Sequence, residues 1–187
     1  MLFFNNPYKN DYDHRPERDT KGRFKDVFFY TGDYHELSFD LKTKKRIQLS
    51  CLLFGLLFFS ALLLPGLLNQ PSSRSILVCL PYVFMFLPLI FYFSGVFSFF
   101  QASLLLTRER FDKSVLRMKH SAVALLVLAI ISLICGIRWM IMNKGGSSPS
   151  AEIIYLLGHL PLIVLVIVFG KYYDKSFTVK EKEESAP

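Results

Sequence analysis

Charged side chains are almost missing from four long stretches of this 187-residue sequence. Residues 1–46, 107–120 and 171–187 hold most of the charges, and the segments between them are nearly continuous apolar runs. A soluble domain distributes charge along its surface helices, so this segregation excludes an ordinary soluble fold and indicates lipid as the solvent. The composition agrees, because 52% of the residues are hydrophobic and the mean hydropathy is +0.34.

Compact catalytic signatures are also absent from the sequence. It contains no GxSxG, HExxH, Walker A or GxGxxG pattern, and no apolar span contains two carboxylates. The cysteines Cys51, Cys79 and Cys135 lie apart inside apolar stretches, as small buried hydrophobic residues do. The sequence therefore gives no positive indication of an enzyme, and we expect no cofactor.

Two further classes of ligand are disfavoured by where the polar residues lie. The net charge of +7 would suit nucleic acid, but the basic residues flank apolar spans as topology-setting charges do, so we expect no nucleic-acid partner. Asp11, Asp13, His14 and His35 are conceivable metal ligands, but their spacing matches no zinc or calcium loop. We therefore expect no metal site.

The apolar stretches are long enough to cross a bilayer as helices, which predicts an all-α integral membrane protein with a four-helix transmembrane bundle over residues 47–171. The predicted spans are 47–68, 76–106, 121–142 and 152–171. At about 1.5 Å per residue the second span exceeds the bilayer thickness, so it must tilt, project past the membrane, or kink at Pro81, Pro88 or Gly95. A less favoured alternative makes residues 76–88 an interfacial or re-entrant segment.

The polar N-terminal region contains strand-like patterns. Val27–Tyr30 is a run of strand formers, residues 31–33 have turn chemistry, and residues 36–41 alternate polar with apolar side chains. We therefore predict a small β-hairpin over residues 24–41, and an extended or poorly ordered segment over 1–23. Because a lone hairpin is marginal in water, its apolar face should pack on helix ends, lipid headgroups or another subunit.

Lysine and arginine counts orient the bundle. The N-terminal region, residues 1–46, contains ten of them, the 107–120 connection five and the segment after Gly170 four, against three on the opposite side. Under the positive-inside rule both termini, including the tail over 172–187, are cytoplasmic, and we expect a plasma-membrane location. Basic residues beside the spans are expected to contact anionic lipid headgroups. They are Lys42, Lys44, Lys45, Arg46, Arg108, Arg110, Lys113, Arg117 and Lys119.

Small residues at helical spacing indicate where lipid-embedded helices pack closely. They form one stripe in the second span and another in the third. We therefore expect these two spans to form the tightest pair. The predicted packing residues are Ser94, Ser98, Ala102, Ala122, Ala129, Ser132 and Gly136.

Three ionisable residues in the outer half of the bundle give the sharpest site hypothesis, because such groups inside a span are default functional candidates. Glu152 and His159 share one face of the fourth span, and Arg138 lies near the outer end of the third. In a polar cluster, Glu152 would pair with Arg138, and His159 would relay a proton or bind a lipid headgroup. The alternative makes Arg138 a snorkelling residue beside Trp139, Glu152 an exposed first-turn carboxylate and His159 a packed imidazole.

The small bundle, the polar cytoplasmic head and the scarcity of polar groups in the spans favour a non-enzymatic accessory or scaffold subunit of a larger membrane assembly. Its expected partners are the lipid bilayer and either another membrane protein or a second copy of the chain. A small oligomeric transporter or channel is the second hypothesis, supported by the proline-rich second span and by Glu152. A lipid-modifying membrane enzyme is the third, supported by His159, Glu152 and Arg138.

Overall fold

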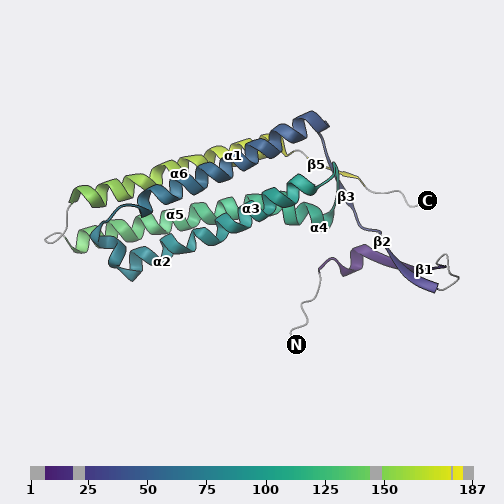
Figure 1. Cartoon of the computed structure of the whole chain (residues 1–187), viewed down its shortest axis with the longest axis horizontal. Helices are drawn as coiled ribbons and strands as arrows, with labels where there is room; N and C mark the ends of the chain where they lie inside the picture. Colours follow the sequence, from purple (N-terminus) through teal and green to yellow (C-terminus); the bar gives the residue numbers. More distant parts are fainter. Residues whose placement is uncertain (1–6, 19–23, 144–148, 178, 183–187) are drawn as a thin grey trace.

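An antiparallel helical bundle with two small sheets at one end makes up the described part of the chain (Figure 1). The computed structural model describes residues 7–18, 24–143, 149–177 and 179–182. Four of its helical segments are long and apolar enough to cross a membrane, as predicted. They are Leu41–Gly66, Ile76–Gln101, Arg108–Met142 and Ser150–Ser176.

Helix α1 (Leu41–Gly66) begins earlier than the first predicted span. Its start is fixed by Asp40, whose side chain accepts a hydrogen bond from the Thr43 amide at 3.1 Å, as a helix N-cap does. The basic residues that follow Asp40 therefore form the first turns of α1. One side of the helix is buried at helical spacing, through Ile47, Cys51, Phe58 and Leu62.

The second apolar segment is kinked, which was one of the alternatives expected for it. It consists of α2 (Ile76–Phe84) and α3 (Phe86–Gln101), separated at Met85. Pro88 explains the break, because it has no amide hydrogen and its ring would crowd the carbonyl of residue 84 in a continuous helix. The helix ends at Gln101, before the predicted end, and is followed by strand β4 (Leu105–Thr107).

The basic 107–120 connection extends the third helix. Helix α4 (Arg108–Phe111), the π-helical turn η3 (Asp112–Leu116) and α5 (Arg117–Met142) run on as one helical segment. Thr107 caps its start by accepting a hydrogen bond from the Arg110 amide at 3.4 Å. Helix α6 (Pro149–Ser176) likewise extends beyond the predicted fourth span at both ends.

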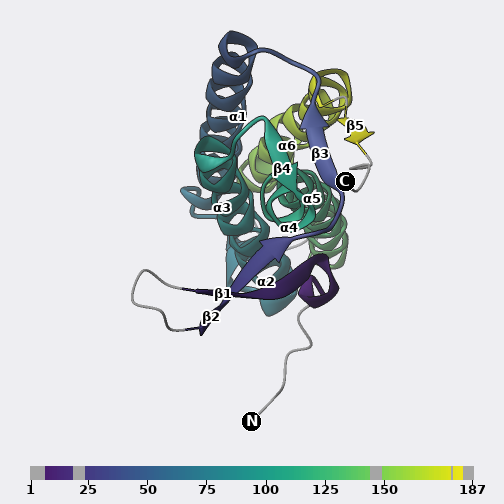
Figure 2. The same ribbon diagram turned by 90° about the vertical axis from the view of Figure 1, so that its right-hand side faces the viewer.

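The strand pairing differs from the predicted hairpin over 24–41. Strand β1 (Tyr12–Arg18) pairs antiparallel with β2 (Phe24–Tyr30), whereas β3 (Tyr34–Leu37) lies between β4 and β5 (Val179–Lys182). The turn after β2 therefore leads the chain away to a different sheet (Figure 2). The composition of β1 does not predict a strand, because the segment is polar and contains a proline; in the structure it is exposed along its whole length.

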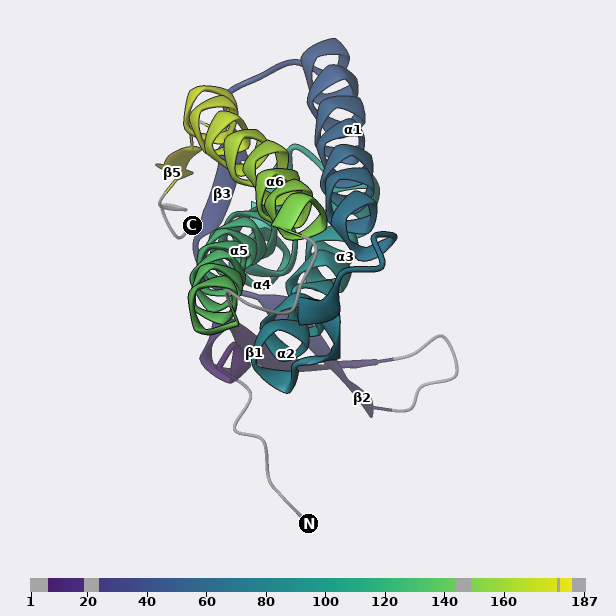
Figure 3. The ribbon, with the colours of Figure 1, turned by 90° about the vertical axis from the view of Figure 1, so that its left-hand side faces the viewer.

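Each long helix packs against two neighbours, as the end-on view shows (Figure 3). Helix α1 contacts α3 and α6, and α5 also contacts α3 and α6. Three aromatic side chains from three helices, Phe58, Tyr92 and Phe169, form part of the core. The ring centroid of Tyr92 lies 5.3 Å from that of Phe58 and 5.3 Å from that of Phe169, and the centroids of Phe58 and Phe169 are 5.8 Å apart. All three pairs are edge-to-face, a favourable aromatic geometry.

The small-residue stripes are divided between two interfaces. The second and third spans approach closely at Gly95, where an added Cβ would lie 2.9 Å from Met118 Cγ and 3.0 Å from the carbonyl oxygen of Ser114. Gly136 of the third span instead meets α6, since a Cβ there would lie 2.7 Å from Leu156 Cδ2. The α5 stripe therefore faces α6 at this level and not the second span.

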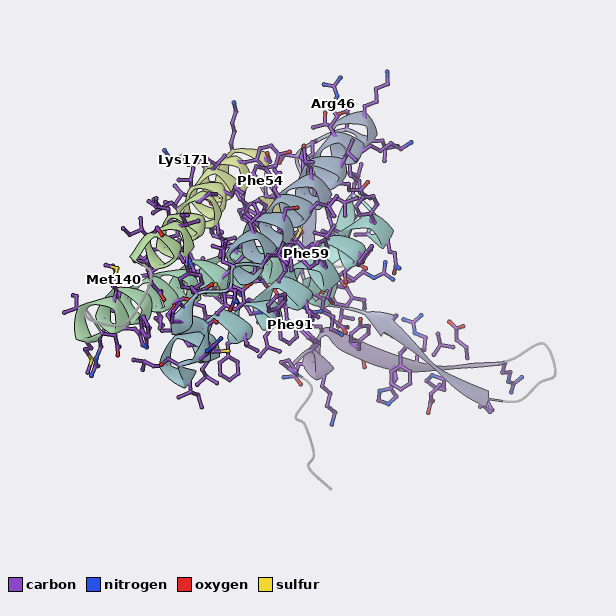
Figure 4. The ribbon with its side chains drawn as sticks, turned by 60° about the vertical axis from the view of Figure 1, so that its left-hand side comes forward. Arg46, Phe54, Phe59, Phe91, Met140 and Lys171 are labelled. Atoms are coloured by element: carbon purple, nitrogen blue, oxygen red, sulfur yellow. The ribbon has the colours of Figure 1, made fainter. Side chains whose placement is uncertain are left out.

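The outer surface of the bundle is apolar over its middle part. Phe59 and Phe91 are 40% and 56% exposed on the outside of the helices (Figure 4). Arg46 and Lys171 lie toward the end that carries the sheets, and Met140 toward the opposite end (Figure 4). This charged-end, apolar-middle pattern agrees with the charge segregation in the sequence.

Candidate functional site

His159 lies in the core of the bundle, bound to α5. Its Nε2 atom is 3.1 Å from the hydroxyl of Ser132, and its Nδ1 atom is 3.0 Å from the carbonyl oxygen of Tyr155. A carbonyl can only accept, so Nδ1 carries the hydrogen and Nε2 accepts from Ser132 in the neutral ring. The imidazole is 1% exposed.

Tyr155 completes this group from one helical turn earlier on α6. Its ring lies edge-to-face with that of His159 at a centroid distance of 4.7 Å, and its hydroxyl is 3.4 Å from the Ser132 hydroxyl. Residues four apart share a helical face, and the small Ser132 lets both rings approach α5. His159 thus has both ring nitrogens in hydrogen-bonding contact, as in the packed-imidazole interpretation.

Glu152 is buried at the end of the bundle opposite the sheets. It lies in the first turn of α6, is 1% exposed, and its Oε1 atom accepts a hydrogen bond from the Ser72 amide at 2.9 Å. Ser72 belongs to the short helix η2 (Pro71–Arg74) in the connection between α1 and α2. The expectation of an exposed first-turn carboxylate is therefore wrong, because η2 covers the side chain.

Arg138 does not join the predicted polar cluster. It is exposed and lines an apolar surface hollow of about 360 Å³ with Ile134 and Ile141, and no ion pair links it to Glu152 in the described part of the chain. Gly136 faces α6. Arg138 follows two residues later and is therefore rotated by about 200° around the helix axis. Arg138 consequently points away from α6, where Glu152 lies.

Lys44, one of the predicted headgroup residues, instead ties two helices together. Lys44 is 8% exposed, and its Nζ atom donates to the carbonyl oxygen of Ala102 at the end of α3. One turn later, Gln48 Nε2 donates to the carbonyl oxygen of Phe99 at 3.0 Å. The Lys44 bond satisfies the Ala102 carbonyl beyond the end of α3, and the Phe99 carbonyl accepts from Gln48 in addition to the Ala102 amide. The first two turns of α1 therefore cap the end of α3 that lies beside the sheets.

Arg117 likewise turns inward, donating from Nη1 to the Ser94 hydroxyl at 2.9 Å. Among the other predicted headgroup residues, Lys113 pairs with Glu109, and Lys119 Nζ lies 3.1 Å from Asp174 Oδ1. The remaining five are exposed at the sheet-bearing end. They are Lys42, Lys45, Arg46, Arg108 and Arg110.

Comparisons with protein-family models, curated proteins and solved structures found no match to this chain.

The four conceivable metal ligands of the N-terminal region are divided among three elements. Asp13 and His14 are on β1, Asp11 is in η1 (Lys9–Asp11), and His35 is on β3, where its ring stacks on Phe111 at 4.5 Å. Within the described ranges, no group of three or more histidine, cysteine, aspartate or glutamate residues is placed to hold a metal ion.

The β1–β2 hairpin covers a groove at the end of the bundle. Tyr12, Phe28 and Tyr30 line one side, and residues from the end of α3 through η3, including Arg110, line the other, enclosing about 720 Å³. Partial burial raises the pKa of Tyr12 and of Tyr30 above the ordinary tyrosine value. Both phenols are therefore neutral hydrogen-bonding groups near neutral pH, bonded to Glu109 and to the carbonyl oxygen of Asp33 respectively.

The sequence predicts Glu152 and His159 as site residues and Ser132 as a packing residue, but not Tyr155 or Ser72 as their partners. Tyr155 was detectable, since it stands one turn before His159 on the same helical face. Ser72 was not, because it lies 80 residues from Glu152 and only the tertiary fold brings the two together.

Proposed function

We propose that the four helices cross a bilayer with both termini in the cytoplasm. The apolar outer surface supports insertion, because it would otherwise be exposed to water along the whole bundle. An even number of crossings puts both termini on one side, and the sheet-bearing end also carries nearly all of the lysine and arginine residues. The positive-inside rule supports making that side cytoplasmic, as expected for a plasma-membrane protein.

The protein then acts as a non-enzymatic accessory subunit whose bundle anchors a recognition surface for a membrane protein partner. The observation that carries this proposal is the exposure of aromatic side chains on the β1–β2 hairpin: Phe24 is 70% and Phe28 72% exposed. Large exposed aromatic residues are enriched at protein interfaces and are costly on a free surface.

The hairpin presents these rings on one face. In its register Tyr12 pairs with Tyr30, His14 with Phe28 and Arg18 with Phe24, so alternate residues of both strands share that face. The Arg18 guanidinium lies 5.1 Å from the Phe24 ring centroid, a cation–π contact that fixes the ring at the hairpin's far end. An extended partner segment beside this face would meet aromatic rings, the groove and Arg110 on the opposite wall.

Polar groups in the core support a structural role for the bundle. His159, Gln48 and Tyr92 each hydrogen-bond to another residue of the bundle, the Tyr92 hydroxyl donating to the carbonyl oxygen of Cys51 at 2.9 Å. These bonds tie helices together. A transporter is the second candidate, favoured by one observation, the burial of Glu152 in the outer part of the bundle.

A photo-crosslinking amino acid at position 28 tests the proposal in intact cells. We expect a discrete protein adduct on irradiation, and mass spectrometry of that adduct identifies the partner; a band at twice the chain mass identifies self-association. The matched control places the same amino acid at Leu53, which is 56% exposed on α1 and would face lipid.

A double substitution, Phe24→Ser with Phe28→Ser, provides the second arm. Recovery of the crosslinked partner by affinity purification should fall severalfold, while the bundle keeps its thermal stability because neither ring belongs to its core. Equal recovery with the substituted hairpin, or no protein adduct at position 28, contradicts a recognition role for this surface.

A further inference from the structure

Two buried oxygen-bearing side chains, Gln70 and Ser72, come from the α1–α2 connection, and a third, Glu152, comes from the start of α6, which this connection contacts. Glu152 is 1% exposed, Gln70 2% and Ser72 0%. The hydrogen bond from the Ser72 amide to Glu152 holds η2 against the carboxylate. Gln70 precedes Ser72 by two residues, so the two Cα atoms are within about 8 Å of each other.

Two of these side chains, Gln70 and Ser72, have buried oxygens without a hydrogen-bond partner in the described part of the chain. Oε1 of Gln70 and Oγ of Ser72 are enclosed, and neither makes a hydrogen bond with any residue the structure describes. The ion pairs found across the described ranges also leave out Glu152. A buried carboxylate without a positive partner and buried acceptors without donors both cost free energy.

We propose that Glu152, Gln70 and Ser72 form a binding site for a monovalent alkali cation at the outer end of the bundle. Carboxylate, amide carbonyl and hydroxyl oxygens are the ligands that hard cations prefer. One carboxylate neutralises one positive charge, whereas a divalent ion would leave a net charge in apolar surroundings. The cation accounts for both unpartnered oxygens and for the carboxylate.

The cation would link two parts of the chain that lie far apart in the sequence. Gln70 and Ser72 come from the connection after α1, and Glu152 comes from the first turn of α6. Binding therefore fastens the outer end of the bundle. This inference goes beyond the proposed accessory role and does not depend on the hairpin or its partner.

Thermal unfolding of the purified full-length protein in detergent tests the site, with Na⁺ as the probe. Unfolding is measured in sodium chloride and in choline chloride at equal ionic strength. Sodium should raise the Tm with increasing concentration, because a ligand that binds only the folded state stabilises it by mass action. Glu152→Gln keeps a carbonyl acceptor for the Ser72 amide, removes the charge, and should abolish the sodium dependence.

Two further variants keep the test decisive. Ser72→Ala removes one ligand but retains the backbone bond to Glu152, and it should raise the sodium concentration for half-maximal stabilisation by about tenfold. Glu36→Gln, which alters an exposed carboxylate on β3, should leave the sodium effect intact. The proposal is wrong if the wild-type Tm is equal in the two salts, if the sodium effect is unchanged in Ser72→Ala, or if Ca²⁺ stabilises and Na⁺ does not.

Discussion

The side-chain nitrogen of Lys44 donates a hydrogen bond to the carbonyl oxygen of Ala102, joining the start of α1 to the end of α3. A lysine in a basic cluster beside a membrane span would ordinarily extend into the headgroup region. Here the end of α3 leaves carbonyls unpaired, and Lys44 satisfies one of them.

Replacing Lys44 with Met should destabilise the bundle. The substitution keeps most of the apolar stem but removes a charged hydrogen bond, which is worth about 1.5–3 kcal/mol when the acceptor is left buried. Unfolding in detergent by heat or denaturant measures the loss. Lys45→Met is the matched control, since Lys45 is exposed and its replacement should change stability by less than about 0.5 kcal/mol.

A second pair of variants compares two helical glycines. Gly95→Ala should cost about 1–3 kcal/mol, because the new methyl would meet the Ser114 carbonyl and Met118 at closer than normal contact. Gly170→Ala should be neutral or stabilising by up to about 1 kcal/mol, because nothing lies within 4 Å of its added Cβ and alanine favours helix. Equal effects of the two variants would contradict the close approach of α3 to the third helix.

Asp40 should make stability depend on pH at the start of α1. Its hydrogen bonds with the Thr43 side chain and amide lower the pKa of the carboxyl below the ordinary value. A carboxyl with a lowered folded-state pKa stabilises the fold fully above the unfolded-state pKa, about 3.8, and loses that contribution as the pH falls through the folded-state value.

Asp40→Asn tests this cap. Asparagine retains a capping oxygen but has no charge, so the wild type should unfold at a higher temperature at pH 7, and the difference should shrink below about pH 4. Thr43→Val should reduce the same pH dependence, because it removes the threonine hydroxyl that binds the carboxylate. A difference between wild type and Asp40→Asn that stays constant with pH would contradict the assignment.

Single cysteines test the proposed orientation. In a background with the three native cysteines replaced by alanine, Ser73→Cys lies in the outer connection and Ser38→Cys beside β3, both at exposed positions. A membrane-impermeant maleimide added to intact cells should label position 73 alone, and lysis should expose position 38. Labelling of position 38 in intact cells would reverse the orientation.

The four helices were predictable because long uncharged runs admit few other structures. The boundaries of these helices could not be predicted, since hydropathy indicates which residues would lie in lipid and not where a helix begins or ends. Asp40 begins α1 by capping, and the basic residues of 108–120 continue as helix because lysine and arginine are good helix formers. The kink near Pro88 could be anticipated from the chemistry of proline alone.

The pairing of segments that lie far apart in the chain could not be predicted from the sequence. Strand β1 has a polar composition that predicts no strand, and it forms because β2 offers backbone partners. The polar cluster shows the same limit: periodicity placed Glu152 and His159 on one face, but the fold decided that Ser72 covers the carboxylate and that Arg138 faces outward.

The central position of β3 sets an order of assembly. Its partner β4 follows the second helical segment, whereas β5 follows α6. During synthesis, one edge of β3 therefore stays unpaired until α6 and β5 have been made. Both edges of β3 are paired only after α6 has been synthesised, so complete pairing of this sheet follows the synthesis of the four long helical segments that the structure describes.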